Sequence, residues 1–103
     1  MQEITMLYVM TMRWQPGLTR EERDGILIRR AQWSYPDDVT VVGEYWTASE
    51  DMAIVVVFDA DDFAPIMDIA FTWGDGFQVT TCPAISAEEG LKMGPSVLEQ
   101  RRA

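Results

Sequence analysis

The stretch DMAIVVVFDADD, residues 51–62, constrains the fold more than any other part of the sequence. It reads as a β-strand, in which successive side chains point to opposite faces of a sheet. The side chains on one face would be Met52, Ile54, Val56 and Phe58, and their alternates would be Ala53, Val55 and Val57. An antiparallel sheet in a small domain ordinarily buries one face and exposes the other to water. Here neither face is polar, so something has to cover a second sheet face.

The composition is that of a single folded domain, with 103 residues of which 48% are hydrophobic and 24% are charged. The net charge is −9, and no basic stripe interrupts the acidity, which argues against nucleic acid and anionic membrane surfaces as partners. No signal peptide is evident, and no apolar run approaches the roughly 20 residues of a membrane span. We expect a soluble, cytoplasmic protein.

Alternation, helical spacing and turn residues predict four strands and two principal helices. The expected strands are residues 5–14, 39–47, the opening stretch and 77–85, and the expected helices are residues 20–33 and a segment from Phe63 to Gly74. Thr19 and Glu22 form a capping box before the first helix. That helix is expected to direct Ile26, Leu27, Ala31 and Trp33 to a core, and Arg20, Arg23, Asp24 and Arg30 to solvent. In the second helix the apolar residues at helical spacing are Phe63, Ile66, Met67, Ala70 and Phe71.

The C-terminal segment is expected to hold one more, short helix. Ser86 and Glu89 repeat the capping pattern, and Gly94-Pro95 is expected to break the helix. We therefore expect a single domain over residues 1–92 and a C-terminal tail or docking arm over residues 93–103.

The order β-α-β-β-α-β predicts a ferredoxin-like α+β sandwich, with a four-stranded antiparallel sheet and two helices. Both helices must lie on one face of the sheet, because the crossover connections are right-handed. The other face would then be a bare apolar patch, large enough to mark an interaction site. A second copy of the chain is the simplest cover, so we expect a homodimer or a higher oligomer.

Three stretches carry a resemblance to a known superfamily: MLYVMTMRWQPG, the hairpin through FDADD, and FQVTTCPAISAEEG. Over residues 5–92 the chain resembles the dimeric α+β-barrel superfamily, and more narrowly a small bacterial and archaeal branch of unknown function. The resemblance implies that two sheets pack face to face into a barrel. Relatives include cofactor-independent monooxygenases acting on polycyclic phenols, haem-degrading enzymes, lactone isomerases and proteins with no known activity. The fold by itself does not choose among them.

The chain has no histidine, which excludes Ser–His and Cys–His catalysis within it and removes the usual haem and metal ligand. Glu44 is then the first candidate for a catalytic base, with Tyr45 beside it. By alternation Glu44 shares a face with Val42 and Trp46, and a carboxylate among apolar neighbours would have a raised pKa. Alternatively, Glu44 is a solvated charge on an edge strand that discourages aggregation.

Aromatic residues supply a candidate ligand site. Tyr8, Trp14 and Trp46 would line a pocket with Arg13 at its polar end, and such pockets hold an electron-rich phenol in the cofactor-independent oxygenases of the resembled superfamily. Alternatively, these side chains pack in the core and the interface. No cofactor and no metal are expected.

Two further features favour structural roles. Cys82 is the single cysteine, so it forms no intramolecular disulfide, and we favour a buried, inert thiol over a reactive one. The cluster Asp59, Asp61 and Asp62 lacks calcium-loop spacing and is better explained as capping of the next helix.

Three functions remain open. The first is a dimeric barrel that binds a small apolar or aromatic molecule between sheet and helices. The second is a cofactor-independent monooxygenase or isomerase. The third is a structural oligomerisation module without a ligand. We favour the first, because the aromatic and methionine content suits a cavity and no acid–base pair is evident.

Overall fold

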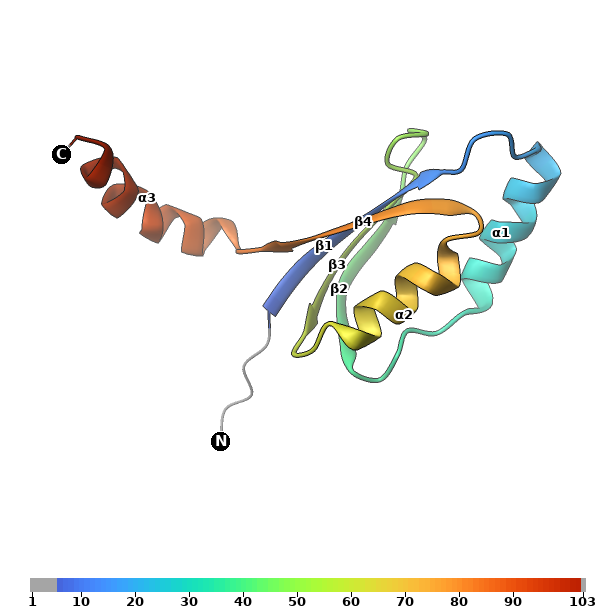
Figure 1. Cartoon of the computed structure of the whole chain (residues 1–103), viewed down its shortest axis with the longest axis horizontal. Helices are drawn as coiled ribbons and strands as arrows, with labels where there is room; N and C mark the ends of the chain where they lie inside the picture. The colour runs from blue at the N-terminus through green and yellow to red at the C-terminus, as the bar shows by residue number, and fades with distance from the viewer. Residues whose placement is uncertain (1–5, 103) are drawn as a thin grey trace.

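The computed structural model describes residues 6–102 and contains seven elements, drawn in Figure 1. The strands are β1 (Met6–Trp14), β2 (Val39–Trp46), β3 (Ile54–Ala60) and β4 (Phe77–Ala84). The helices are α1 (Arg20–Gln32), α2 (Ala64–Trp73) and α3 (Ala87–Arg102).

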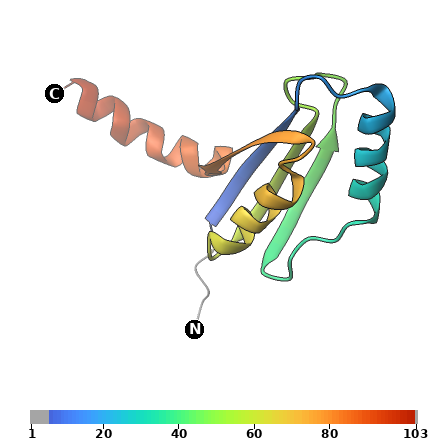
Figure 2. The same ribbon diagram turned by 45° about the vertical axis from the view of Figure 1, so that its right-hand side comes forward.

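The four strands form one antiparallel sheet in the order β2-β3-β1-β4. Helices α1 and α2 lie on the same face of this sheet (Figures 1 and 2). This is the predicted ferredoxin-like α+β arrangement. Pro83 lies in β4, which is an edge strand. Proline has no backbone N–H to donate, and it is tolerated in edge strands because one side of such a strand has no neighbouring strand.

The core lies between the sheet and the two helices. The even-numbered residues of β1 and β3 point toward the helices, and those buried there are Met10, Met12, Ile54, Val56, Phe58 and Ala60. Helix α2 contributes Ile66, Ile69 and Trp73. Its other large apolar side chains, Phe63, Met67 and Phe71, lie on the outer side and are exposed. We call this layer the helix-covered face and the opposite layer the open face.

The N-terminus of α1 is capped as predicted, but its C-terminal end is not oriented as predicted. Thr19 Oγ1 accepts from the Glu22 N–H at 3.1 Å, and Glu22 returns a bond to the Thr19 N–H at 3.0 Å. Ala31, expected in the core, is exposed, whereas Arg30, expected in solvent, is only 4% exposed. Arg30 can be buried because a carboxylate on β2 neutralises its charge.

Strand β2 contains a β-bulge that the sequence pattern did not reveal. Val41 pairs with Phe58 and Gly43 pairs with Val57, so Val42 is an extra residue that shifts the alternation. The expected shared face is therefore right for Glu44 and Trp46, which pair with Val56 and Ile54, and wrong for Val42. The bulge instead places Glu44 on the helix-covered face with Val41.

Helix α3 runs without interruption past Gly94-Pro95, so the predicted break is wrong, and the expected boundary after residue 92 falls inside a helix. No residue of α3 is buried, and the helix projects away from the sheet in both views (Figures 1 and 2). Interior glycine costs about 1 kcal/mol and interior proline about 3 kcal/mol in helix stability. Isolated helices of this length are marginal in water even when rich in alanine, so local sequence preferences give α3 little stability.

None of the helices in the described part of the chain is both long enough and apolar enough to cross a membrane.

The assignment of the helix-covered face predicts the effect of charge at its centre. Val56→Asp places an unpaired carboxylate at a fully buried position, so we expect a loss of about 4 kcal/mol or more in the free energy of unfolding. Urea unfolding followed by circular dichroism measures it. Val42→Asp, on the exposed bulge, is the control, with an expected change within about 0.5 kcal/mol. A Val56→Asp variant with the wild-type midpoint would contradict the assignment.

Candidate functional site

The most organised polar cluster lies where the end of α1 meets β2. Two atoms of the Arg30 guanidinium contact Glu44: Nε donates to Oε2 at 3.2 Å and Nη2 donates to Oε1 at 2.8 Å. The Arg30 side chain is 1% exposed and that of Glu44 is 21% exposed. This two-pronged geometry is the one in which arginine binds a carboxylate most strongly.

Aromatic rings surround the buried guanidinium. Its central carbon lies 4.9 Å from the ring centroid of Trp33, 5.3 Å from that of Tyr35 and 4.8 Å from that of Trp73. Each ring face attracts the cation through its quadrupole, most strongly where water is excluded. The residue that the sequence assigned to solvent is therefore held by three rings and an ion pair.

Tyr35 and Trp46 complete the hydrogen bonding of Glu44. The Tyr35 hydroxyl donates to Glu44 Oε1 and accepts from Arg30 Nη2 at 2.7 Å. The Trp46 indole N–H donates to Glu44 Oε2 at 2.7 Å. Both carboxylate oxygens therefore accept hydrogen bonds from protein donors.

These contacts set the protonation of the cluster. Burial raises the pKa of Glu44, but the hydrogen bonds from Arg30, Trp46 and Tyr35 outweigh it, and the pKa lies below its usual range. The pKa of Tyr35 is raised, by burial first and then by its hydrogen bond to Glu44. Glu44 is therefore an ion-paired carboxylate and Tyr35 a neutral hydroxyl at neutral pH.

The expectation of a raised pKa for Glu44 is thus wrong, and the alternative of a freely solvated edge charge does not describe this residue either. Tyr45, the second candidate catalytic residue, lies on the open face, opposite to Glu44. The two side chains therefore do not converge on a common reacting atom. Their catalytic role stays a prediction that the geometry does not favour.

The four candidate ligand-binding residues lie in different places. Tyr8 stacks on Phe58 with ring centroids 5.9 Å apart, and Trp46 belongs to the Glu44 cluster. Only Arg13 and Trp14 share a hollow, of about 270 Å³, at the far end of β1 from Tyr8.

Two of these candidate residues make structural contacts instead. Trp14 stacks on Phe77 with centroids 4.5 Å apart, and Arg13 forms an exposed ion pair with Asp51 at 3.0 Å. The expected single aromatic pocket is therefore not formed within one protomer by these four residues.

The open face of the sheet carries apolar side chains at the centre of its two central strands, with Thr11, Arg13 and Asp59 farther along the same face. Val9 of β1 lies between Val57 and Cys82 in the ladder, and the neighbouring Thr11 pairs with Val55. Neither α1 nor α2 covers this face, as Figures 1 and 2 show. Cys82 is exposed here, so the expectation of a buried thiol is wrong for the single protomer.

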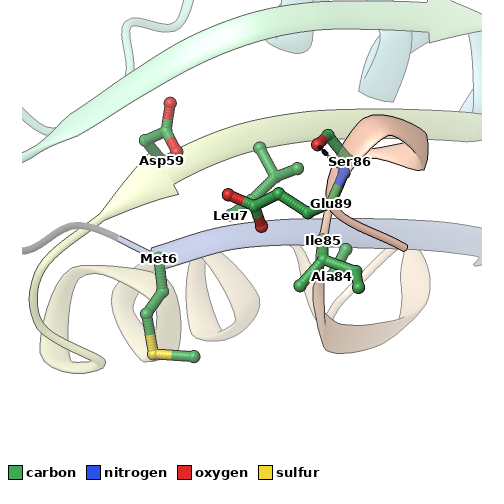
Figure 3. A pocket seen from close by; sticks show the side chains of 7 residues that line it. All are labelled: Met6, Leu7, Asp59, Ala84, Ile85, Ser86 and Glu89. Atoms are coloured by element: carbon green, nitrogen blue, oxygen red, sulfur yellow. Dashed lines mark hydrogen bonds between the residues drawn. The ribbon is translucent and has the colours of Figure 1, made fainter. Parts of the chain in front are cut away.

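A hollow of about 390 Å³ lies at one end of the open face, where β4 leads into α3. Its lining residues are Met6, Leu7, Asp59, Ala84, Ile85, Ser86 and Glu89 (Figure 3). The side chains of Leu7, Ile85 and Glu89 lie near one another in this view. The hollow is therefore lined by apolar side chains together with the carboxylates of Asp59 and Glu89.

The expected capping of α2 by Asp59, Asp61 and Asp62 is met only in part, because the N-cap residue is Phe63 and makes no side-chain cap hydrogen bond. Asp62 accepts a hydrogen bond at 3.3 Å from the N–H of Ala64, the first residue of α2. Within residues 6–102, no three carboxylate or thiol side chains gather in the way that a metal ion requires.

Sequence reasoning missed Arg30, Tyr35, Trp33 and Trp73 as members of the cluster. The available signal was Glu44 itself, because a strand carboxylate among apolar neighbours needs a cation. The preceding helix ends with Arg29 and Arg30, and aromatic residues follow directly. Which arginine turns inward is decided by how α1 packs on the sheet.

Comparison with known proteins yields one family. A family described as "Domain of unknown function (DUF3303)" matches residues 6–98. No curated protein and no solved structure matches the chain.

The cluster predicts a large stability effect of a small change. Glu44→Gln removes the charge that neutralises a buried guanidinium, so we expect the free energy of unfolding to fall by about 2–3 kcal/mol. This is less than for a fully buried pair, because Glu44 keeps some access to water. Glu50→Gln breaks the exposed Arg23–Glu50 pair and is the control, with an expected change of at most about 0.5 kcal/mol. Equal losses of unfolding free energy in both variants would show that the buried Arg30–Glu44 pair contributes no more to stability than the exposed pair.

The lowered pKa of Glu44 also predicts a pH dependence. A carboxyl whose pKa is depressed by folding stabilises the fold above its unfolded-state pKa of about 4.3, and this stabilisation is lost as the pH falls through the folded pKa. We expect urea midpoints measured from about pH 7 down to about pH 3 to fall less steeply for Glu44→Gln than for the wild type. Parallel curves would contradict the assignment.

Proposed function

Because the chain belongs to the DUF3303 family, whose function is unknown, we propose a function from its own geometry: it is a self-associating module. Two copies pack their open sheet faces together and form a dimeric α+β barrel. The observation that carries this proposal is the row of apolar side chains on the open face of β1 and β3, which none of α1, α2 and α3 covers.

The side chains on the open face support a sheet partner in particular. Leu7, Val9, Val55 and Val57 stand on adjacent strands in register and are half-buried in the single protomer. Sheets that pack face to face bury alternate residues of this kind, with no polar groups that need hydrogen-bond partners. Covering each such side chain contributes on the order of 0.5–1 kcal/mol, because only the smaller part of its area is still exposed.

The size of the protomer supports a partner as well. Its accessible surface is 7452 Å², whereas a compact monomer of this mass exposes about 5,900 Å². Its radius of gyration is 16.8 Å, and a compact chain of this length has about 13 Å. The projecting α3 contributes to both excesses, so these values support our proposal that the chain has a packing partner.

A second function, binding of a small apolar molecule, is favoured by the hollow at the end of the open face. Its volume of about 390 Å³ lies in the range of small-molecule sites, and Leu7 and Ile85 supply apolar lining. In this proposal the ligand binds at the mouth of the proposed barrel and not between sheet and helices. The space between sheet and helices is filled by core side chains such as Phe58 and Trp73.

The dimer is tested by charge on the open face. Val55→Asp points away from the core, so we expect a folded protomer that no longer associates at micromolar concentration. Sedimentation equilibrium gives the mass, and circular dichroism reports the fold. Ile28→Asp, which adds the same charge to an exposed position on α1, should leave the dimer intact. A monomeric wild-type protein would contradict the proposal.

Cys82 gives an independent readout of the same interface. Its thiol lies on the open face and is exposed in the protomer, so dimer formation should shield it. We expect a thiol reagent such as dithionitrobenzoate to react roughly tenfold or more slowly with the wild type than with Val55→Asp, since shielded groups react only through opening. Equal rates at concentrations where both proteins have their expected masses would place the interface elsewhere.

Ligand binding is tested with the neutral fluorescent probe N-phenyl-1-naphthylamine. If the hollow is the site, Ile85→Gln should weaken probe binding roughly tenfold, which corresponds to the loss of about 1.4 kcal/mol of apolar contact. Ile28→Gln, an exposed isoleucine on α1, should bind like the wild type. Binding that is equal in both variants would remove the hollow from consideration. A native mass spectrum of the purified protein would report any molecule that it retains.

A further inference from the structure

Helix α3 presents an apolar stripe with no partner in its own protomer. Leu91, Gly94 and Leu98 follow the three- and four-residue spacing of one helix face, and Val97 borders them. Leu91 is 77% exposed. The charged residues Glu88, Lys92 and Glu99 occupy the other side, and an exposed ion pair joins Glu88 to Lys92 at 3.8 Å.

This helix cannot be stable by itself. It contains Gly90 and Gly94, and Pro95 removes a backbone hydrogen bond in its interior. A Cβ at Gly94 would meet nothing within 4 Å, so this glycine leaves open space on the stripe for a close neighbour. A stripe of this composition on a helix that needs packing defines a docking surface.

We infer that the apolar stripe of α3 packs against the second copy of the chain, so that each copy contributes its C-terminal helix to the interface. This inference rests on the proposed dimer. The inference extends the proposed dimer in one respect: the C-terminal helix is part of the interface. Neither copy alone then has a fully packed C-terminal helix.

Continuity of the surface points to the same occupant. Helix α3 follows directly from β4, and Ala84 and Ile85 join the open face to the start of α3 through the hollow in Figure 3. A second sheet placed on the open face would therefore lie beside the beginning of α3, because the hollow adjoins both. The same copy can cover both surfaces without a gap.

The area that a stable dimer needs supports this reading. Four strands of about eight residues make a face of roughly 19 by 26 Å, or roughly 500 Å² per protomer. Two such faces give roughly 1,000 Å², below the roughly 1,200–2,000 Å² of a stable interface. One side of the 16-residue α3 adds roughly 24 by 10 Å per protomer, which raises the total to roughly 1,500 Å².

The test compares two substitutions in the same part of α3. Leu98→Glu places a charge on the stripe, and Gln100→Glu places the same charge on the opposite side of the helix. We expect Leu98→Glu to weaken dimer formation at least tenfold in sedimentation equilibrium, whereas Gln100→Glu leaves the dissociation constant within about twofold of the wild type. Both positions are exposed in the protomer, so neither change should disturb its fold.

Amide hydrogen exchange over residues 87–102 provides the second measurement. The amides should be protected in the wild-type dimer and should exchange freely in monomeric Val55→Asp, because the helix loses its packing partner.

Three results would overturn the inference. Equal dissociation constants for Leu98→Glu and Gln100→Glu, with Val55→Asp still monomeric, would leave the sheet-to-sheet dimer standing and exclude α3 from it. Protection of α3 in the Val55→Asp monomer would show that its own chain covers it. A monomeric wild-type protein would contradict both the proposed dimer and the packing of α3 against the second copy.

Discussion

Strand β3 lies inside the sheet, hydrogen-bonded to β2 on one side and β1 on the other, and its side chains alternate between two apolar faces. The two crossover helices can cover only one of these faces, because right-handed connections place both on the same side. The covered side becomes the core, with Val56 and Phe58 fully buried. The other side keeps Val55 and Val57 at the surface of the protomer. The proposed association follows from this asymmetry, since the hydrophobic effect penalises a large apolar face in water.

The Arg30–Glu44 pair neutralises a carboxylate that the sheet directs toward the helix layer. The bulge in β2 turns Glu44 toward the helix layer, where an isolated charge would be costly. Arg30 neutralises it, and Tyr35 and Trp46 satisfy the remaining acceptor positions. A pair of this kind is weak evidence for overall stability but leaves little freedom in the relative placement of its two elements. The cluster thus fixes the end of α1 against the edge of the sheet.

These arrangements bear on the choice among functions. A catalytic base needs a pKa near the working pH, whereas the pKa of Glu44 is lowered by four donated hydrogen bonds. Tyr45 lies on the other face, so the expected pair of Glu44 and Tyr45 is not assembled. The hollow instead joins the end of the open face to the start of α3, and our proposal uses these surfaces for association and binding. The lowered pKa argues against acid–base catalysis at Glu44.

The sequence alone determined the order of the elements, the ferredoxin-like sheet and its two apolar faces, because local alternation and turn residues encode these directly. The capping box at Thr19 and Glu22 is likewise a local pattern, and the structure contains it. The bulge at Val42, the burial of Arg30 and the continuation of α3 through Pro95 were not predictable in this way. Each depends on contacts between residues far apart in the chain, or on packing that compensates an unfavourable local preference. Tertiary structure therefore decided which charges pair, which aromatic residues surround Arg30 and which apolar surfaces are left for a partner, since those outcomes depend on three-dimensional packing and not on local spacing.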